Sequence, residues 1–196
     1  CVRPDSGERR IGHCGLFNTE CQQVCEVARH HRSIPYIHCV RHRPASIVQD
    51  FPGENPLHAA MVHDLYATQV LLDCAEPDHF SSQFHRTASG QIDLALAQLK
   101  WSGGAVASFA ASYLTPTGVP SRGFDRTEVF GPGWSARISP NPRPIEVWDT
   151  QASWPWGLEV RANPPSGMMA EELRCFCRVV RGLQTVPTGA TYTDAI

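Results

Sequence analysis

A histidine and an aspartate stand side by side, as His63 and Asp64, in the middle of an apolar stretch that runs from residue 55 to residue 73. A neutral imidazole can take up or release a proton near pH 7, and a neighbouring carboxylate can pair with it. Burying such a pair without polar partners is costly. The pair is therefore either a satisfied structural pair or part of a functional site.

The eight cysteines of the chain are the second group of residues that could do chemistry. None of them forms a CxxC pair, and Cys21 and Cys25 lie four apart on a predicted helix. We interpret the cysteines as reduced, mostly buried thiols that act as small apolar residues. A structural zinc bound by Cys21, Cys25 and His30 or His31 is the alternative, and it lacks the usual second pair of ligands. No metal site is therefore expected.

The composition restricts the class of protein and its partners. A chain of 196 residues fits one large domain or two small ones, and with 42% hydrophobic residues it can build a real core. Its 17 basic and 19 acidic residues give a net charge of -2, which implies no strong attraction to nucleic acid or to an anionic membrane. The apolar runs are shorter than the roughly 18 residues of a membrane span, and no signal peptide is recognisable. We expect a soluble, cytoplasmic protein.

The elements that must position His63 follow from periodicity and turn signals. Residues 55–73 show helical spacing, with small alanines on the side of His63, and two further helices are predicted at 20–31 and 168–181, the last one ended by Gly182. A short strand is predicted at 11–17 and an alternating strand at 36–43, ended by Pro44. Residues 1–10 look like a frayed end, and residues 46–54 like a loop.

After Asp73 the chain consists mainly of short strands joined by turns. Strands are predicted at 78–86, 91–101, 105–114, 126–130, 136–139, 145–148 and 156–161. The turns between them contain Gly, Pro, Ser and Asn at hairpin spacing, which predicts an antiparallel meander. The expected fold is α+β, a single domain over residues 11–196 with an open, mainly antiparallel β-sheet and helices packed on one face.

Several nucleotide-binding and catalytic motifs are missing from the sequence. No GxGxxG follows a predicted strand, and GxxxxGK[ST], GxSxG and HExxH do not occur. The chain therefore carries no nucleotide-binding motif of its own.

An ordered series of landmarks resembles the C-terminal domain of the Gfo/Idh/MocA oxidoreductases, a family that includes glucose-fructose oxidoreductase and inositol dehydrogenase. The landmarks are Ile11-Gly-His13, Phe17-Asn18, Arg41-His-Arg-Pro44, Met61-Val-His-Asp64, Glu128-Val-Phe-Gly131 and Ala170-Glu-Glu-Leu-Arg-Cys-Phe176. The resemblance implies an open sheet with helices on one face, whose other face pairs subunits into homo-oligomers.

The resemblance also implies a reaction. In that family an N-terminal Rossmann domain holds NAD or NADP, and a lysine of a Glu-Lys-Pro motif sits beside the nicotinamide. A histidine in the helix before the strands relays the proton while hydride moves between the cofactor and a sugar or polyol carbon. His63 matches this catalytic histidine, and Asp64 matches its common companion, which we expect to contact the substrate.

Further substrate-binding candidates rest on the same resemblance. Arg41 and Arg43 lie on a strand that borders the cleft in relatives; the alternative is a solvated strand end. His13 follows the family's Gly-His, against an equal prospect of plain packing. His58 is next to Ala59, where many members have an aspartate whose place it could take.

The sequence departs from the family pattern at important positions. No Rossmann domain precedes residue 11, so no cofactor-binding residue is expected in this chain, and Tyr66 and Leu16 stand where an aspartate and an arginine are usual. The usual C-terminal helix is cut short at Ile196. We expect the substrate-binding and oligomerisation part of an NAD(P)-dependent oxidoreductase, inactive without a Rossmann domain that is missing or separate. The alternative is a non-catalytic binding or assembly module that kept the fold.

Overall fold

The fold is built around one eight-stranded sheet, whose strands lie in the order β2-β3-β4-β1-β5-β6-β7-β8. The computed structural model describes residues 19–50, 52–116, 123–139, 143–148, 152–153 and 168–187. The strands are β1 (Tyr36–Pro44), β2 (His79–Arg86), β3 (Ile92–Lys100), β4 (Val106–Thr115), β5 (Phe124–Gly131), β6 (Trp134–Ser139), β7 (Arg143–Trp148) and β8 (Ala152–Ser153). The strands expected at 11–17 and 156–161 lie outside the described residues.

The strand order confirms most of the predicted arrangement. β1 and β4 are parallel, and the other neighbouring strands pair antiparallel, so the α+β fold with a mainly antiparallel sheet is confirmed. The uninterrupted meander is wrong at one point, because β1 lies between β4 and β5. β4 ends at Thr115 and β5 begins at Phe124, so more residues separate these two strands than the about two to five of a common hairpin loop.

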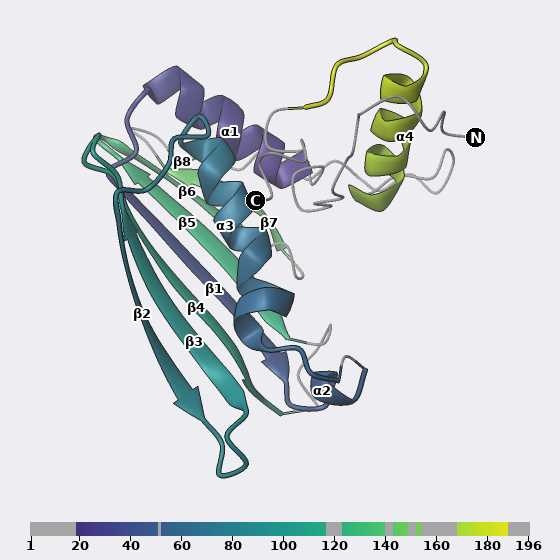
Figure 1. Cartoon of the computed structure of the whole chain (residues 1–196). Coiled ribbons are helices and arrows are strands. Elements are labelled where there is room, and N and C mark those ends of the chain that lie inside the picture. The colour runs from purple at the N-terminus through teal and green to yellow at the C-terminus, as the bar shows by residue number, and fades with distance from the viewer. Residues whose placement is uncertain are drawn as a thin grey trace.

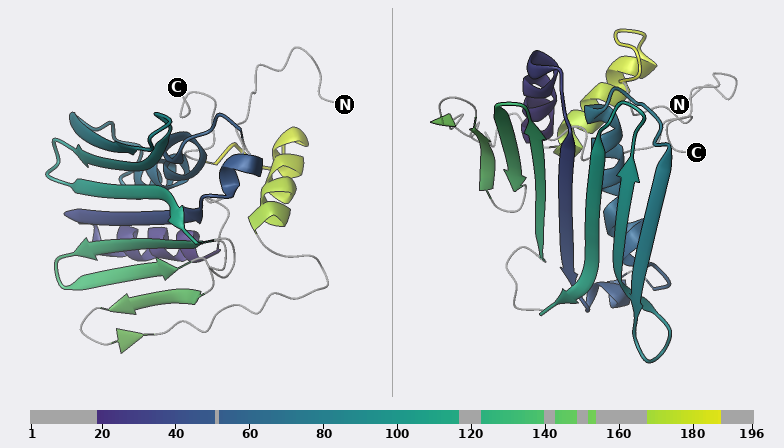
Figure 2. Two further views of the ribbon diagram at one scale, coloured as in Figure 1. Left: turned by 90° about the horizontal axis from the view of Figure 1, so that it is seen from below. Right: turned by 90° about the vertical axis from the view of Figure 1, so that its left-hand side faces the viewer.

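Two helices, α1 (Thr19–His31) and α3 (Val62–Leu71), cover one face of the sheet and contact each other, and both lie in front of the strands in Figure 1. The turn η2 (Leu57–Met61) precedes α3 and contacts β1 and β4. The short α2 (Ile47–Asp50) follows β1. The last helix, α4 (Met168–Val180), lies to one side of the strands rather than over them (Figures 1 and 2).

The core fills the space between the sheet and these helices. Alternate residues of β1 and β4 face the helices, and Ile37, Cys39, Ala107 and Ala111 have no exposed surface. Val24 of α1 belongs to the same cluster. The alanines allow the helices to approach the sheet closely.

The central helix is in the predicted place, but its first part is not α-helical. The side-chain oxygen of Asn55 accepts hydrogen bonds from the backbone N–H groups of Leu57 (3.0 Å) and His58 (3.2 Å), which caps the helix. The turn η2 is then a π-helix, and regular α-helix begins at Val62, so the prediction of one uninterrupted α-helix is corrected. Because a π-turn bonds over one more residue, it rotates the side chains before it relative to those after it.

The cysteines in the described part of the chain are free thiols, and Cys21, Cys25, Cys39 and Cys175 are buried. This agrees with their interpretation as small buried residues. Among the described residues no three His, Cys, Asp or Glu side chains are grouped to hold a metal ion. No helix within the described ranges is both long and apolar enough to cross a membrane.

Gly123 allows β5 to run close against β1. A Cβ atom at Gly123 would lie 2.0 Å from the carbonyl oxygen of His42, and its φ of +125° disfavours other residues. Gly123→Ala should therefore lower the free energy of unfolding by about 2 kcal/mol or more. The matched control is Gly90→Ala, where φ is +85° but no atom lies within 4 Å, with an expected loss of about 1 kcal/mol. Equal losses for both variants in urea unfolding would contradict the close contact.

Candidate functional site

Arg41 is the centre of a buried cluster of ion pairs between β1, α3 and β5. Its Nε and Nη2 donate hydrogen bonds to the two carboxylate oxygens of Asp64 at 3.1 and 2.7 Å, and its Nη1 donates to Asp125 at 2.9 Å. Asp125 stands directly opposite Arg41 in the pairing of β1 with β5. The side chains of Arg41 and Asp64 are only 16% and 5% exposed. The planar guanidinium thus holds the helix against both strands.

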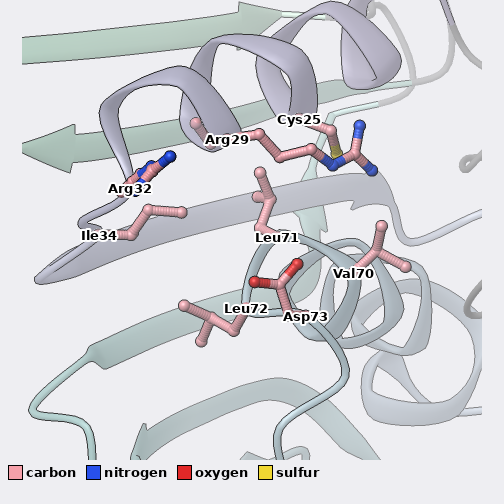
Figure 3. A pocket seen from close by; sticks show the side chains of 9 residues that line it. Cys25, Arg29, Arg32, Ile34, Val70, Leu71, Leu72 and Asp73 are labelled. Atoms are coloured by element: carbon pink, nitrogen blue, oxygen red, sulfur yellow. The ribbon is translucent and has the colours of Figure 1, made fainter.

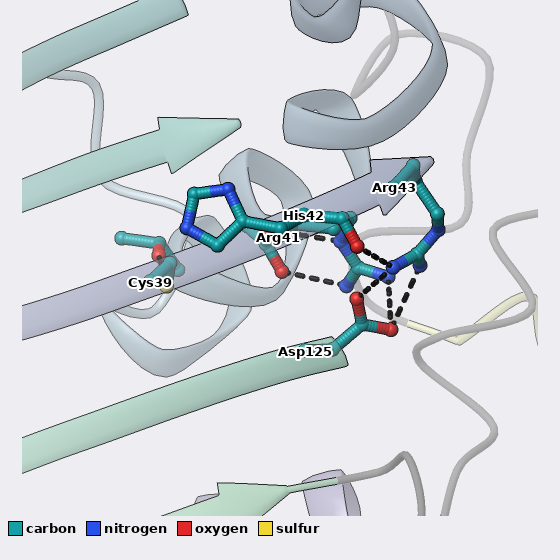
Figure 4. A network of polar contacts seen from close by, with 7 residues as sticks. Cys39, Arg41, His42, Arg43 and Asp125 are labelled. Atoms are coloured by element: carbon teal, nitrogen blue, oxygen red, sulfur yellow. Dashed lines mark hydrogen bonds and ion pairs between the residues drawn. The ribbon is translucent and has the colours of Figure 1, made fainter. Parts of the chain in front are cut away.

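Arg43 adds a second cation to the same cluster (Figure 4). Its Nη2 donates to Asp125 at 2.9 Å, and its Nη1 donates to Asp125 and to the carbonyl oxygen of His42. Two arginines and two carboxylates balance in charge, which makes burial of all four groups tolerable. Burial alone would lower the pKa of Arg41, but the charge of Asp64 and its hydrogen bonds raise that pKa above its usual range.

His63 lies immediately before Asp64 on α3, and its ring is partly buried. Its side chain makes no hydrogen bond or ion pair with any of the described residues. Burial, followed by the charge of Arg41, lowers the pKa of His63 below its usual range. The imidazole is therefore neutral at pH 7, and it has a ring nitrogen that can accept a proton.

The other candidates lie outside this cluster. The His58 ring is exposed, and its Nδ1 lies 3.4 Å from the side-chain nitrogen of Asn55. Ala59 offers no carboxylate beside it. His13 lies outside the described residues.

The structure thus brings Arg41, Arg43 and Asp64 together beside His63. Arg41 donates to Asp64 and Asp125, and Arg43 donates to Asp125 and to the His42 carbonyl. A structural role accounts for these contacts, and a direct role in substrate binding stays a prediction. Sequence reasoning missed Asp125, whose arginine partners stand 82 and 84 positions earlier in the chain. The predicted strand at 126–130 began one residue too late to place Asp125 on the same face as Thr127 and Val129.

Comparison with known proteins adds information about the fold. No family model and no curated protein matches the sequence. Among solved structures, the UDP-N-acetylglucosamine 3-dehydrogenase from Acidithiobacillus ferrooxidans matches with a TM-score of 0.77 at 18% identity, over 94% of this chain and 55% of that chain.

Two further solved structures are similar to nearly all of this chain. The aldose-aldose oxidoreductase from Caulobacter crescentus, complexed with glycerol, has a TM-score of 0.69 at 16% identity, over 95% of this chain and 57% of that one. A 3-ketoreductase from Actinomadura kijaniata, in complex with TDP-benzene and NADP, has a TM-score of 0.66 at 15% identity, over 90% and 54%. The chain spans little more than half the length of these proteins. The likeness establishes the fold, and it confirms at that level the resemblance to the C-terminal domain of Gfo/Idh/MocA oxidoreductases.

Removing Asp64 should destabilise the protein strongly. Asp64→Ala leaves the buried guanidinium of Arg41 without its two-pronged partner, so we expect the free energy of unfolding to fall by about 3 to 5 kcal/mol. The control is Glu171→Ala, which breaks an ion pair with Arg174 on the surface of α4 and should cost less than about 1 kcal/mol. Denaturant unfolding of both variants measures the difference. A loss for Asp64→Ala no greater than that of the control would show that the cluster does not hold α3 in place.

Proposed function

We propose that this chain is the substrate-binding and subunit-association part of an NAD(P)-dependent oxidoreductase that acts on a sugar, a polyol or a related hydroxy or keto compound. The observation that carries the proposal is the neutral imidazole of His63, which has no polar partner among the described residues and lies beside the Arg41 cluster. The likeness in fold to a sugar-nucleotide dehydrogenase and to a sugar oxidoreductase supports it.

The proposed role of His63 is to move a proton. Oxidation of an alcohol removes a hydride from carbon and a proton from the hydroxyl group. The free ring nitrogen of His63 accepts that proton, and in the reverse direction it returns the proton to the carbonyl oxygen. The Arg41 cluster acts indirectly, because it fixes α3, and with it the ring of His63, against β1.

The described residues do not supply a dinucleotide site of the usual kind. Residues 131–136 have the spacing GxGxxA, but they lie in the hairpin between β5 and β6. A dinucleotide-binding turn leads from a strand into the N-terminus of a helix, which holds the pyrophosphate. We therefore propose that NAD or NADP is held by a dinucleotide-binding domain other than the region described, either joined to this chain or separate. That domain supplies the hydride chemistry, and this chain supplies the substrate site.

The face of the sheet opposite α1 and α3 is the proposed surface for subunit association. Tyr36 and Phe130 are directly paired on β1 and β5, their rings stack with centroids 5.6 Å apart, and they are 38% and 39% exposed. Leu96, Val106 and Phe124 are exposed on the same face of neighbouring strands. Exposed apolar side chains on several adjacent strands, with the charged Glu128 and Arg126 among them, fit a surface that pairs with a second copy.

The catalytic role of His63 can be tested in this chain joined to a dinucleotide-binding domain. His63→Gln should lower kcat for the sugar or polyol substrate by about 10²- to 10⁴-fold, since a proton acceptor is lost. Because the pKa of His63 is lowered, the parent enzyme should lose activity only at a pH below the ordinary histidine pKa of about 6.5, where the imidazole becomes charged, and the variant should lack this step. Steady-state rates as a function of pH measure both effects.

Two controls make this test decisive. His30→Gln changes an exposed histidine of α1 and should leave kcat unaltered. The chain by itself should bind no NADPH in a titration. Micromolar binding would contradict the proposal that a different domain holds the cofactor. Unchanged turnover in His63→Gln would show that His63 is not catalytic, and it would favour the non-catalytic assembly module. The lack of a carboxylate at Ala59 is an argument for that alternative.

The association surface has its own test. Phe130→Lys places a charge beside the exposed Tyr36 on this face and should weaken self-association by at least about tenfold, as measured by sedimentation velocity. Phe80→Lys is the control, because Phe80 is 82% exposed on the edge strand β2 and lies on the other face of the sheet. A monomeric parent protein, or equal weakening in both variants, would refute association through this face.

A further inference from the structure

A cavity of about 430 Å³ opens between the carboxyl ends of α1 and α3, at the end of α3 farther from His63 (Figure 3). Part of its lining is apolar and comes from Ala28, Ile34, Val70, Leu71 and Leu72. The remaining lining residues are Cys25, Arg29, Arg32 and Asp73. The cavity therefore combines a thiol, two cations and one carboxylate with an apolar wall.

The charged side chains that line the cavity are exposed to solvent. The side chains of Arg29, Arg32 and Asp73 make no hydrogen bond or ion pair with the described residues. Arg32 directly follows α1, and Asp73 stands two residues after the end of α3; both have left-handed backbone, with φ of 61° and 53°. Two unpaired cations and one unpaired carboxylate match a small molecule that carries carboxylate groups and an ammonium group.

The thiol of Cys25 has the surroundings of a reactive cysteine. Cys21, one helical turn earlier, donates a hydrogen bond to the Cys25 sulfur, and together with the charge of Arg29 this outweighs burial and lowers the pKa of the Cys25 thiol. Cys25 is only 7% exposed, so a reagent reaches its sulfur through the cavity that it lines. Thiolate character beside a cation, with access from a cavity, is what makes a cysteine react selectively.

We propose that this cavity is a modification site, in which Cys25 forms a mixed disulfide with a small disulfide compound that carries carboxylate and ammonium groups. The Cys25 thiolate attacks one sulfur of the disulfide, a new S–S bond forms, and the other half leaves as a thiolate. The small disulfide is the oxidant, so no other co-reactant is needed. Carboxylates of the attached half pair with Arg29 and Arg32, and its ammonium group pairs with Asp73.

The helix geometry favours this product over a bond between Cys21 and Cys25. Residues four apart on an intact helix have Cβ atoms about 5 to 6 Å apart, whereas a disulfide needs about 3.5 to 4.5 Å. Cys21 therefore acts as a hydrogen-bond donor to the Cys25 sulfur. The site is about 15 Å along α3 from His63, since ten residues at about 1.5 Å each separate His63 from Asp73. Its test is thus independent of the proposed function.

Glutathione disulfide is a suitable probe, because each half carries two carboxylates and one ammonium group. The full chain is incubated with it at pH 7, and the adduct is located by peptide mass spectrometry over time. We expect Cys25 to react faster than the exposed Cys177, and Cys25→Ser to remove the adduct. A second reagent, the uncharged bis(2-hydroxyethyl) disulfide, gives a reference rate at Cys25. In Arg29→Ala the ratio of the rate with glutathione disulfide to this reference rate should fall by about three- to fivefold.

This ratio separates binding of the ligand from activation of the thiol, since loss of Arg29 weakens thiolate formation equally for both reagents. Arg178→Ala, a charge change on the distant α4, is the control and should leave the ratio at Cys25 unchanged. Reaction at Cys177 with none at Cys25, or a Cys21–Cys25 disulfide as the product, would overturn the modification site. An unchanged ratio for Arg29→Ala would overturn the recognition of the carboxylates.

Discussion

The buried guanidinium of Arg41 is the constraint on which the rest of the structure depends. Arg41 stands on the helix-facing side of β1, in line with the fully buried Ile37 and Cys39. A cation in such a place is tolerated only if carboxylates reach it from the neighbouring elements. Asp64 comes from α3 and Asp125 from β5. The Arg41 side chain therefore links α3 and β5 to β1.

The same requirement explains features at a distance from the charges. Asp125 can meet Arg41 only if β5 runs close beside β1 in the observed register. Gly123, at the entrance to β5, makes that approach possible because any side chain there would collide with the His42 carbonyl. Burial is the main cause that lowers the pKa of the neighbouring His63, and the charges of Arg41 and Arg43 add to it while those of Asp64 and Asp125 oppose it. The packing of α3 and the register of β5 thus depend on the same buried cation.

Local patterns in the sequence predicted the elements better than their connections. Helical spacing located the helix over 55–73, and Gly and Pro turns located the hairpins between β2 and β3 and between β5 and β6. The insertion of β1 beside β4 could not be predicted, because parallel pairing across about 70 residues leaves no local signal. The π-turn before Val62 was missed for a related reason, since its residues Leu57 to Met61 have ordinary helix propensity.

The sequence indicated Arg41, Arg43 and Asp64 as site candidates but not their contacts with one another. Arg41, Arg43 and Asp64 were all expected to face a substrate, and alternation along β1 did place both arginines on one side. Which side is buried depends on α3 and β5, whose carboxylates come from distant segments, so the sequence could not reveal that these groups satisfy one another. Unlike Arg41, Arg43 and Asp64, His63 has no polar partner among the described residues, because the residues one turn away on the helix, such as Ala59, Ala60 and Ala67, are small.

The absence of an orienting carboxylate has a consequence for the proposed proton transfer. Asp64 directs both of its oxygens at Arg41, and Ala59 offers none, so the ring of His63 is held by packing alone among the described residues. A proton taken from a hydroxyl group would create an imidazolium close to two guanidinium groups, which the carboxylates only partly offset. Such a base holds its proton weakly. The geometry therefore suits a relay that passes the proton onward to water more than a base that stores it through a catalytic cycle.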